Sequence, residues 1–132
     1  IKDCKLIAEK NEIKFKFNSY FPIRSLNLMR GVLVAEEDNI KNYYIDNIFN
    51  TIWQDGLNMN DEIIIQKVLK NLNTNPKTFS LRSTSSLIKD SLRKKTTEAY
   101  EKGIFGAPTF VVNDKIFWGQ DRLEFALKEA SK

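Results

Sequence analysis

The chain has 132 residues, of which 42% are hydrophobic and nine are phenylalanine. This composition excludes a disordered chain and supplies enough apolar material for the core of one domain, or of one domain with an insertion. Lys and Arg total 21 against 17 Asp and Glu, and the net charge of +4 is dispersed along the sequence. We therefore expect a globular protein without a nucleic-acid partner.

Two residue types that dominate catalytic and metal chemistry are nearly missing. The sequence has no histidine and a single cysteine, Cys4. Without histidine, the usual general base and the commonest metal ligand are lost, and one cysteine excludes an internal disulfide or a CxxC motif within these residues. We therefore expect no bound metal, assign no catalytic residue and interpret Cys4 as an idle thiol.

The sequence also bears on location. It contains no apolar run long enough to cross a membrane and no signal peptide, so we expect a cytoplasmic protein without a membrane partner. Because the first residue is Ile1 rather than methionine, we expect a chain that is processed, truncated or incomplete.

The first elements along the chain are predicted to be mainly helical. Residues 2–10 are expected to be the last part of a helix. Alternating apolar residues over 12–17 then indicate an extended segment. Pro22 suits the first turn of a helix that runs to about Glu36. Apolar residues that recur every four positions predict a second helix over about 39–54.

Three more helices are expected before the C-terminal part. The first covers about 61–71 and is capped by Asn60 or Asp61. A proline in a first-turn position predicts a short helix over 76–82. A longer helix follows over about 84–102 and is ended by a glycine.

The C-terminal part predicts a hairpin followed by a helix. A strand is expected at 109–112 and another at 116–118. The Asn113-Asp114 pair between them tolerates positive φ at both residues, so it should close a tight hairpin. Asp121 is then a natural N-cap for the last helix, and an acidic residue three positions later completes a capping box.

The same C-terminal residues carry a family signature, which reads GIFGAPT at 103–109 and FWGQDRL at 117–123. These segments resemble the C-terminal signature of the 2-hydroxychromene-2-carboxylate isomerases. That family is similar to kappa-class glutathione transferases and, more distantly, to DsbA-type thiol oxidoreductases. The sequence FPIRSLNLMR at 21–30, together with Trp53, resembles the helical insertion of the same family, so the resemblance covers nearly the whole chain.

The resemblance implies an α-rich α/β fold, the C-terminal ββα part of a thioredoxin-like (DsbA/kappa-type) domain with a large helical insertion. Residues 1–20 and 103–132 would form the partial thioredoxin-like domain, and residues 21–102 the insertion. About twenty residues before the insertion are too few for the N-terminal βαβ segment of a thioredoxin core, so we expect that segment to be missing. The hairpin would then have an unpaired edge, which a swapped or sheet-continuing homodimer would satisfy.

The resemblance further implies that glutathione is the cofactor and that four residues contact it. Pro108 is expected in the cis form, which turns the backbone N–H and C=O of Ala107 toward the cysteinyl part of glutathione. Gln120 and Asp121 would hold its γ-glutamyl end, through free N–H groups at the helix start and through the Asp121 carboxylate. The alternatives are a trans proline entering an edge strand and an Asp121 that serves only as an N-cap.

The implied activity is a glutathione-dependent isomerisation. The glutathione thiolate would add reversibly to a small, unsaturated, aromatic-derived substrate, which permits bond rotation and ring opening. The serine that activates the thiolate in this family has no counterpart in these residues, so it stays open whether this chain alone is active. Two alternatives also stay open, namely a DsbA-like thiol-disulfide oxidoreductase and a non-enzymatic dimeric binding module.

Aromatic residues outside the four contacts are expected mainly in the core. Phe105 and Trp118 belong to this group, because such residues more often pack inside than stack on a substrate. Tyr43, Tyr44 and Trp53 could form a hydrophobic wall for a substrate, but their helical spacing favours the core.

Overall fold

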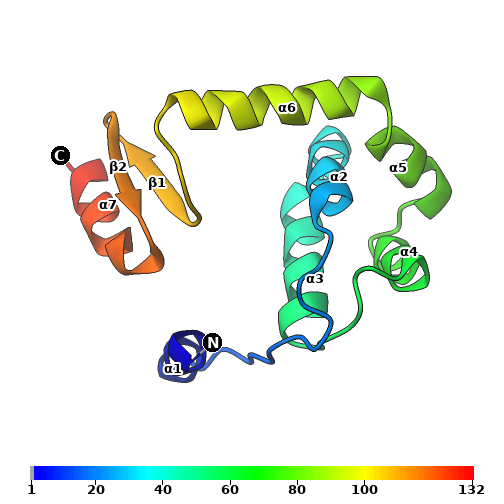
Figure 1. The fold of residues 1–132 in the computed structure, drawn as a ribbon, viewed down its shortest axis with the longest axis horizontal. Coiled ribbons are helices and arrows are strands. Elements are labelled where there is room, and N and C mark those ends of the chain that lie inside the picture. The colour runs from blue at the N-terminus through cyan, green and yellow to red at the C-terminus, as the bar shows by residue number, and fades with distance from the viewer. Residues whose placement is uncertain (1) are drawn as a thin grey trace. The chain divides into compact units, whose positions relative to one another are not determined.

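A computed structural model describes residues 2–132. Its internal contacts divide the chain into two compact units, Ile1–Leu92 and Arg93–Lys132. The boundary falls within a long helix, α6 (Ser86–Glu101), which is the yellow-green helix of Figure 1. The predicted assignment of 1–20 and 103–132 to one domain, with 21–102 as an insertion, stays a prediction.

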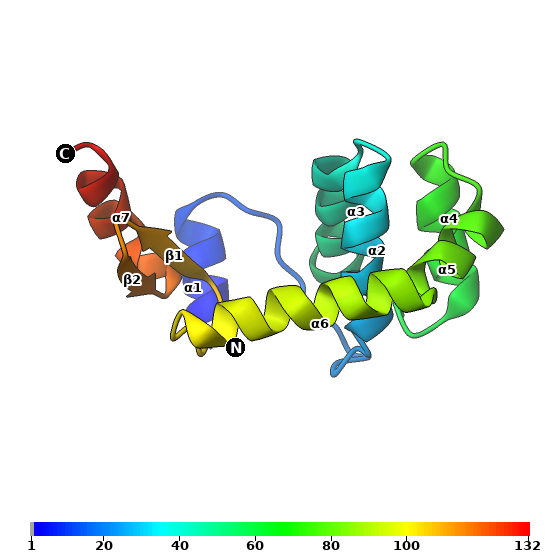
Figure 2. The same ribbon diagram turned by 90° about the horizontal axis from the view of Figure 1, so that it is seen from above.

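Helices build the first unit. α2 packs against α3 and α5, and α4 also packs against both of them. The two views agree that α2 and α3 lie side by side (Figures 1 and 2). The bounds of its helices before α6 are α1 Lys2–Lys10, α2 Leu26–Glu37, α3 Lys41–Trp53, α4 Glu62–Asn71 and α5 Pro76–Ser83.

The core of this unit lies where α2 to α5 meet. Val34 and Ala35 of α2 are completely buried. The ring of Tyr44 stacks on that of Phe79 with centroids 5.5 Å apart, and the Tyr44 hydroxyl donates to the backbone carbonyl of Leu28 at 3.0 Å. Burial raises the pKa of the Tyr44 phenol well above its ordinary value, so the hydroxyl remains a neutral donor in the core.

Polar caps define the beginnings of α4 and α5. The Asp61 carboxylate accepts from the backbone N–H of Ile63 at 2.9 Å, which confirms the cap predicted at this position. Asn75 accepts from the N–H of Thr78 at 3.1 Å, and Pro76 occupies the first turn of α5 as expected.

The predicted beginning of α2 is wrong. The helix begins at Leu26, so Pro22 lies before it rather than in its first turn. The backbone N–H of Arg24, in the irregular segment before the helix, donates to the side-chain oxygen of Asn60 at 2.8 Å. The bond joins segments 36 residues apart, so periodicity could not indicate it.

The segment predicted to be extended forms no strand within the described chain. Residues 13–18 are irregular, and the backbone N–H of Lys16 donates to the carbonyl of Trp53 at 2.6 Å. Asn18 is completely buried, and its side-chain amide donates to two backbone carbonyls near the end of α3, both at 2.9 Å. These bonds attach the segment to α3 and its following loop.

The second unit begins with the end of α6. Gly103 has a φ of +79°, and its N–H donates to the carbonyl of Tyr100 at 2.8 Å. The N–H of Ile104 donates to the carbonyl of Ala99 at 3.1 Å, which completes a Schellman motif. The glycine therefore ends the helix in the predicted way.

A β-hairpin and a helix follow. β1 (Thr109–Val112) pairs antiparallel with β2 (Lys115–Trp118), and Thr109 lies opposite Trp118. Asn113 and Asp114 have φ values of 49° and 60°, which confirms the predicted turn. The final helix, α7 (Leu123–Ala130), packs against both strands (Figure 1).

The predicted N-cap of the last helix is wrong. A short 3-10 helix, η1 (Gln120–Arg122), precedes α7, and Arg122 occupies the cap position without a capping side-chain bond. Gly119 turns the chain with a φ of +102°, and its carbonyl accepts from the Arg122 N–H at 3.1 Å. Asp121 therefore lies inside a tight turn, where its carboxylate pairs with Arg122 at 2.7 Å.

Candidate functional site

The structure brings the four predicted contact residues together at one end of the hairpin. Beyond the paired Thr109 and Trp118, the chain continues to Pro108 on one side and Gly119 on the other. The N–H of Gly119 donates to the Pro108 carbonyl at 2.9 Å, which extends the ladder by one step. Ala107 therefore lies near the beginning of η1, which contains Gln120 and Asp121.

Ala107 presents a free backbone at this end. Its peptide bond to Pro108 is cis, and both residues are exposed. Within residues 2–132, the N–H and C=O of Ala107 have no hydrogen-bond partner. An extended peptide-like ligand can pair with such a donor and acceptor as an added strand would.

The beginning of η1 presents charged and polar groups beside Ala107. The N–H groups of Gln120 and Asp121 are unpaired in the described part of the chain, as expected for the first residues of a helix. The Asp121 carboxylate and the Arg122 guanidinium are both exposed, and Arg122 also lies 5.8 Å from the ring centre of Phe125. This arrangement offers donors for a carboxylate and an acceptor for an ammonium group.

Two aromatic residues predicted for the core are instead exposed. Phe105 is 73% exposed and Trp118 is 53% exposed, with their ring centroids 5.1 Å apart. The indole nitrogen of Trp118 lies directly over Gly106, where any Cβ would overlap it. The core prediction is wrong for this pair because the other residues of this unit do not cover the two rings, which stay exposed to solvent.

Two of the three residues considered for a hydrophobic substrate wall, Tyr44 and Trp53, line a cavity in the first unit. This apolar cavity of about 260 Å³ opens between α2, α3 and the segment that leads into α2. Ile45, Phe49 and Trp53 of this lining recur at a helical spacing of four residues, which is equally typical of a core. Its lining consists of Phe21, Ile23, Ser25, Leu28, Met29, Val32, Tyr44, Ile45, Ile48, Phe49, Ile52 and Trp53.

The three aromatic residues predicted for the core of the helical part have different environments. Tyr44 is 3% exposed, so the core interpretation is confirmed for it. Tyr43 is 70% exposed and lies on the surface, which the core interpretation did not predict. Trp53 is half-buried, lines the cavity and stacks on Phe15 with ring centroids 6.0 Å apart.

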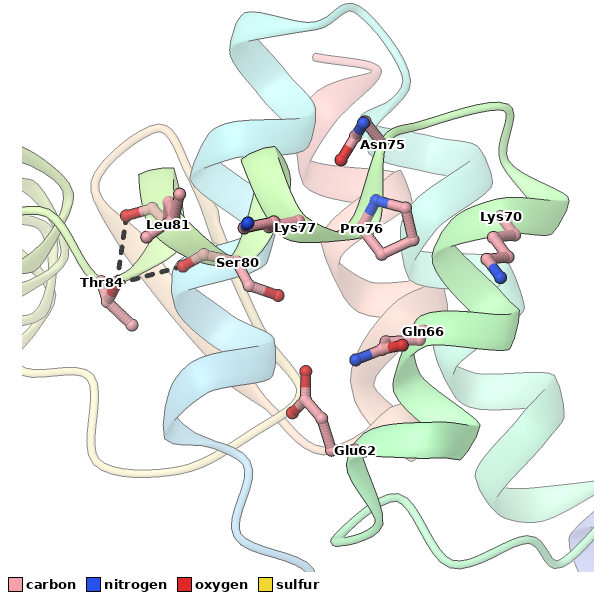
Figure 3. Close-up of a pocket in the computed structure, with 9 residues that line it drawn as sticks. All are labelled: Glu62, Gln66, Lys70, Asn75, Pro76, Lys77, Ser80, Leu81 and Thr84. Atoms are coloured by element: carbon pink, nitrogen blue, oxygen red, sulfur yellow. Dashed lines mark hydrogen bonds between the residues drawn. The ribbon is translucent and has the colours of Figure 1, made fainter.

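A broader groove lies between α4 and α5 and has a volume of about 580 Å³ (Figure 3). Glu62, Gln66 and Lys70 approach it from α4, and Lys77 approaches it from α5. Its charges are of both signs, and none of the four predicted contact residues lines it. This lining is typical of a solvated groove between two surface helices.

Residues 2–132 contain neither a metal-binding cluster nor a membrane-spanning helix. No group of three or more His, Cys, Asp or Glu side chains in this range could hold a metal ion. No helix in the same range is both long enough and apolar enough to cross a membrane. Cys4 is a free, exposed thiol.

Three isomerases show sequence similarity to the chain. The 2-hydroxychromene-2-carboxylate isomerase of Sphingobium xenophagum is 28% identical over 123 residues, or 93% of this chain and 62% of that protein. The protein of the same name from Pseudomonas sp. (strain C18) is 28% identical over 128 residues, or 97% of this chain and 59% of that protein. The one from Pseudomonas putida is 30% identical over 87 residues, or 66% of this chain and 42% of that protein.

A solved structure of a 2-hydroxychromene-2-carboxylate isomerase also matches the fold. It superimposes with a TM-score of 0.85 at 25% sequence identity, over 98% of this chain and 62% of that one. The chain thus spans about six tenths of the length of these relatives. The DSBA-like thioredoxin domain family matches residues 1–130. This match and the structural likeness confirm the expected fold class, and the chain belongs to the DSBA-like thioredoxin domain family.

Proposed function

We propose that the chain is part of a glutathione-dependent isomerase of the 2-hydroxychromene-2-carboxylate isomerase type. Glutathione is the cofactor, and its thiolate adds reversibly to an unsaturated aromatic-derived substrate, which allows bond rotation and ring opening before the thiolate leaves. The similarity to three isomerases of that name supports the reaction type. The cytoplasm is the proposed compartment, because its pool of thiols is kept reduced.

One observation carries the proposal for the cofactor. The free backbone of Ala107 lies next to the beginning of η1, at the end of the hairpin where Gly119 is bonded to Pro108. An extended tripeptide fits such a corner: its middle residue pairs with Ala107, and its γ-glutamyl carboxylate faces the N–H groups of Gln120 and Asp121. The Asp121 carboxylate accepts from the ammonium group of the same glutamyl unit.

The test is a calorimetric titration of the 132-residue chain with reduced glutathione. We expect saturable binding that the Asp121→Ala variant weakens by about tenfold, the loss of one charge-assisted hydrogen bond. Glu101→Ala removes an exposed carboxylate from the last turn of α6, and this control should leave the affinity unchanged. A folded chain that gives no heat of binding contradicts the cofactor site.

A second measurement addresses the reaction itself. The chain is mixed with 2-hydroxychromene-2-carboxylate, with and without glutathione, and the ultraviolet absorbance is followed as the ring opens. Turnover that requires glutathione supports the proposal, and equal turnover without it contradicts the cofactor role. Disulfide reduction in place of isomerisation would favour the thiol-disulfide oxidoreductase, and glutathione binding without either reaction would favour a binding module.

The proposed protein partner is a second copy of the chain. Within the described residues, the hairpin is a two-stranded sheet whose outer edges have no neighbouring strand. Val111 and Ile116 lie opposite each other on it and are 44% and 39% exposed. Open edges and an apolar face favour pairing with another chain, so a homodimer would cover both.

A further inference from the structure

We propose that the groove between α4 and α5 binds a free α-amino acid with an apolar side chain. The side chain enters an inner cavity beneath the groove, the ammonium group faces Glu62, and the carboxylate faces Lys77. All residues that line the groove and the inner cavity belong to the first unit. The site is therefore distinct from the glutathione corner, and it does not depend on the isomerase reaction.

The groove continues inward into a smaller cavity between α2, α4 and α5. This inner cavity has a volume of about 140 Å³. Glu62, Ser80 and Thr84 line both spaces, so the inner cavity opens into the groove where these three residues lie. By its charges alone the groove resembles an ordinary solvated surface, but the inner cavity gives it an interior.

The floor of the inner cavity is buried and mostly apolar. Leu28, Leu69 and Phe79 are at most 6% exposed and come from three different helices. The Tyr44 hydroxyl also lies here, and it already donates to the Leu28 carbonyl at 3.0 Å. The buried Ser83 hydroxyl likewise donates to the Phe79 carbonyl at 2.9 Å, so neither hydroxyl needs a polar guest. Such a space favours an apolar group over water.

The volume of the inner cavity selects the size of the apolar group. A dry apolar cavity of about 150 Å³ holds one benzene molecule. The inner cavity has about 140 Å³, which leaves room for a single ring or a branched alkyl group and not for fused rings. The side chains of phenylalanine and leucine are of this size.

Unpaired polar groups gather where the inner cavity opens. The Glu62 carboxylate, the Gln66 amide and the Ser80 hydroxyl point into the space between α4 and α5 (Figure 3). Within residues 2–132, none of these three side chains makes a hydrogen bond or an ion pair. An ammonium group needs acceptors, and the carboxylate, the amide oxygen and the hydroxyl oxygen can supply them, with Glu62 providing the opposite charge.

A cation lies on the wall that faces Glu62. Lys77 lines the groove from α5, is exposed and makes no ion pair in the described part of the chain. Glu62 and Lys77 therefore line one groove from two helices without pairing, and Lys70 of α4 adds a second unpaired cation. A free amino acid matches both signs of charge, because its ammonium group, carboxylate and side chain all leave one carbon. A simple amine or carboxylic acid would match only one of them.

Two isoleucines of α4 make the test specific. Ile65 lines the inner cavity, whereas Ile63 is 64% exposed and lines neither space. We would label the isoleucine δ1 methyl groups with carbon-13 and titrate the chain with L-phenylalanine, using Ile65→Val and Ile63→Val to assign the two signals. We expect a saturable ring-current shift of the Ile65 methyl and a nearly constant Ile63 signal.

Matched ligands separate the two charges. Glu62→Gln should weaken the binding of L-phenylalanine and of L-phenylalaninamide by at least about fivefold, because both ligands carry the ammonium group. Lys77→Gln should weaken L-phenylalanine about threefold and leave L-phenylalaninamide, which lacks the carboxylate, unchanged. Glu9→Gln makes the same change as Glu62→Gln at an exposed position of α1, and should leave both affinities unchanged.

A blocked opening locates the side chain of the ligand. Ser80→Leu adds bulk where the groove meets the inner cavity and should weaken L-phenylalanine by at least about tenfold. Thr78→Leu makes a similar change at an exposed position of α5 that lines neither space, and should not. If Ser80→Leu does not fold, Glu62→Gln decides, because Glu62 is exposed and its change adds no bulk.

Several outcomes overturn the proposal. These are an Ile65 signal that does not move at tens of millimolar L-phenylalanine, and an undiminished affinity in Glu62→Gln or in folded Ser80→Leu. Equal affinities of the native chain for L-phenylalanine and L-phenylalaninamide would overturn the choice of a free amino acid over the end of a peptide. Tighter binding of 3-phenylpropanoate, which lacks the ammonium group, would contradict the role of Glu62.

Discussion

At the scale of single residues, Gly31 shows how tightly the helical core is packed. It is buried in α2, and a Cβ at this position would overlap the Tyr44 hydroxyl and lie 2.7 Å from the Tyr44 ring carbon Cζ. We therefore expect Gly31→Ala to lower the free energy of unfolding by about 1–3 kcal/mol, measured by urea denaturation.

A double variant identifies the cause. Tyr44→Phe removes the hydroxyl that the new methyl group would strike, at the cost of its bond to the Leu28 carbonyl. Gly31→Ala should therefore destabilise the Tyr44→Phe background less than the native chain. Equal losses in both backgrounds would show that the hydroxyl is not the obstacle.

Glu129 links the stability of the second unit to pH. Its carboxylate accepts from Lys132 at 2.8 Å and from Lys115 at 2.9 Å, and these bonds lower the Glu129 pKa from 4.5 to about 2. A lowered carboxyl pKa contributes stability that is fully present above pH 4.5 and is lost as the pH falls toward 2. We expect Glu129→Gln to flatten the stability profile of this unit in that window.

Trp118 fluorescence in a Trp53→Phe background measures this effect, because Trp118 is then the sole tryptophan and lies in the second unit. Thermal midpoints would be recorded from pH 6 to pH 2 for the native and Glu129→Gln side chains. Glu124→Gln, an exposed change in the same helix, is the control and should keep the native profile. A Glu129→Gln profile as steep as the native one would contradict the prediction.

At the scale of elements, caps provide the most direct test of how sequence defines a helix. Asp61→Ala removes the side chain that accepts from the Ile63 N–H at the beginning of α4. We expect a loss of about 1 kcal/mol in the free energy of unfolding, measured by denaturant titration. Asp61→Asn keeps an accepting oxygen and should restore most of that stability. A loss as large in Asp61→Asn would show that charge, and not capping, matters here.

Most elements were predictable because their signals are local. The apolar period of α3, the polar caps of α4 and α5, and the Asn113-Asp114 turn act on residues within a few positions. The failures have another origin. The segment before α2 bonds through Arg24 to the distant Asn60, and the turn at Gly119 places Asp121 inside η1 rather than at a cap.

At the scale of the whole molecule, the open hairpin predicts self-association. We expect sedimentation equilibrium to show a dimer, and Val111→Lys to weaken it by at least about tenfold, because a charge would then face the partner. Leu87→Lys places the same charge at another exposed apolar position, on α6, and should leave the dimer intact. A native chain that stays monomeric at every concentration would contradict the homodimer.

The two candidate sites differ in how much of each could be predicted from the sequence. The signature around Pro108 and Asp121 was visible because its residues are specific in type and spacing, and the hairpin register then brings them to one corner. The aromatic cavity was predicted only as the less favoured alternative, through Tyr44 and Trp53 as a possible substrate wall. Its lining comes from two separate segments, 21–32 and 44–53, and each apolar residue alone is equally typical of a core.

The sequence by itself determined the helices, the hairpin, the family and the four residues proposed to hold glutathione, because these depend on short-range periodicity, caps and a contiguous motif. Only the tertiary structure decided which aromatic residues are buried. Tyr44 lies in the core, Trp53 lines a cavity, and Phe105 and Trp118 stay exposed. Burial depends on which segments meet in space, and no local pattern contains that information.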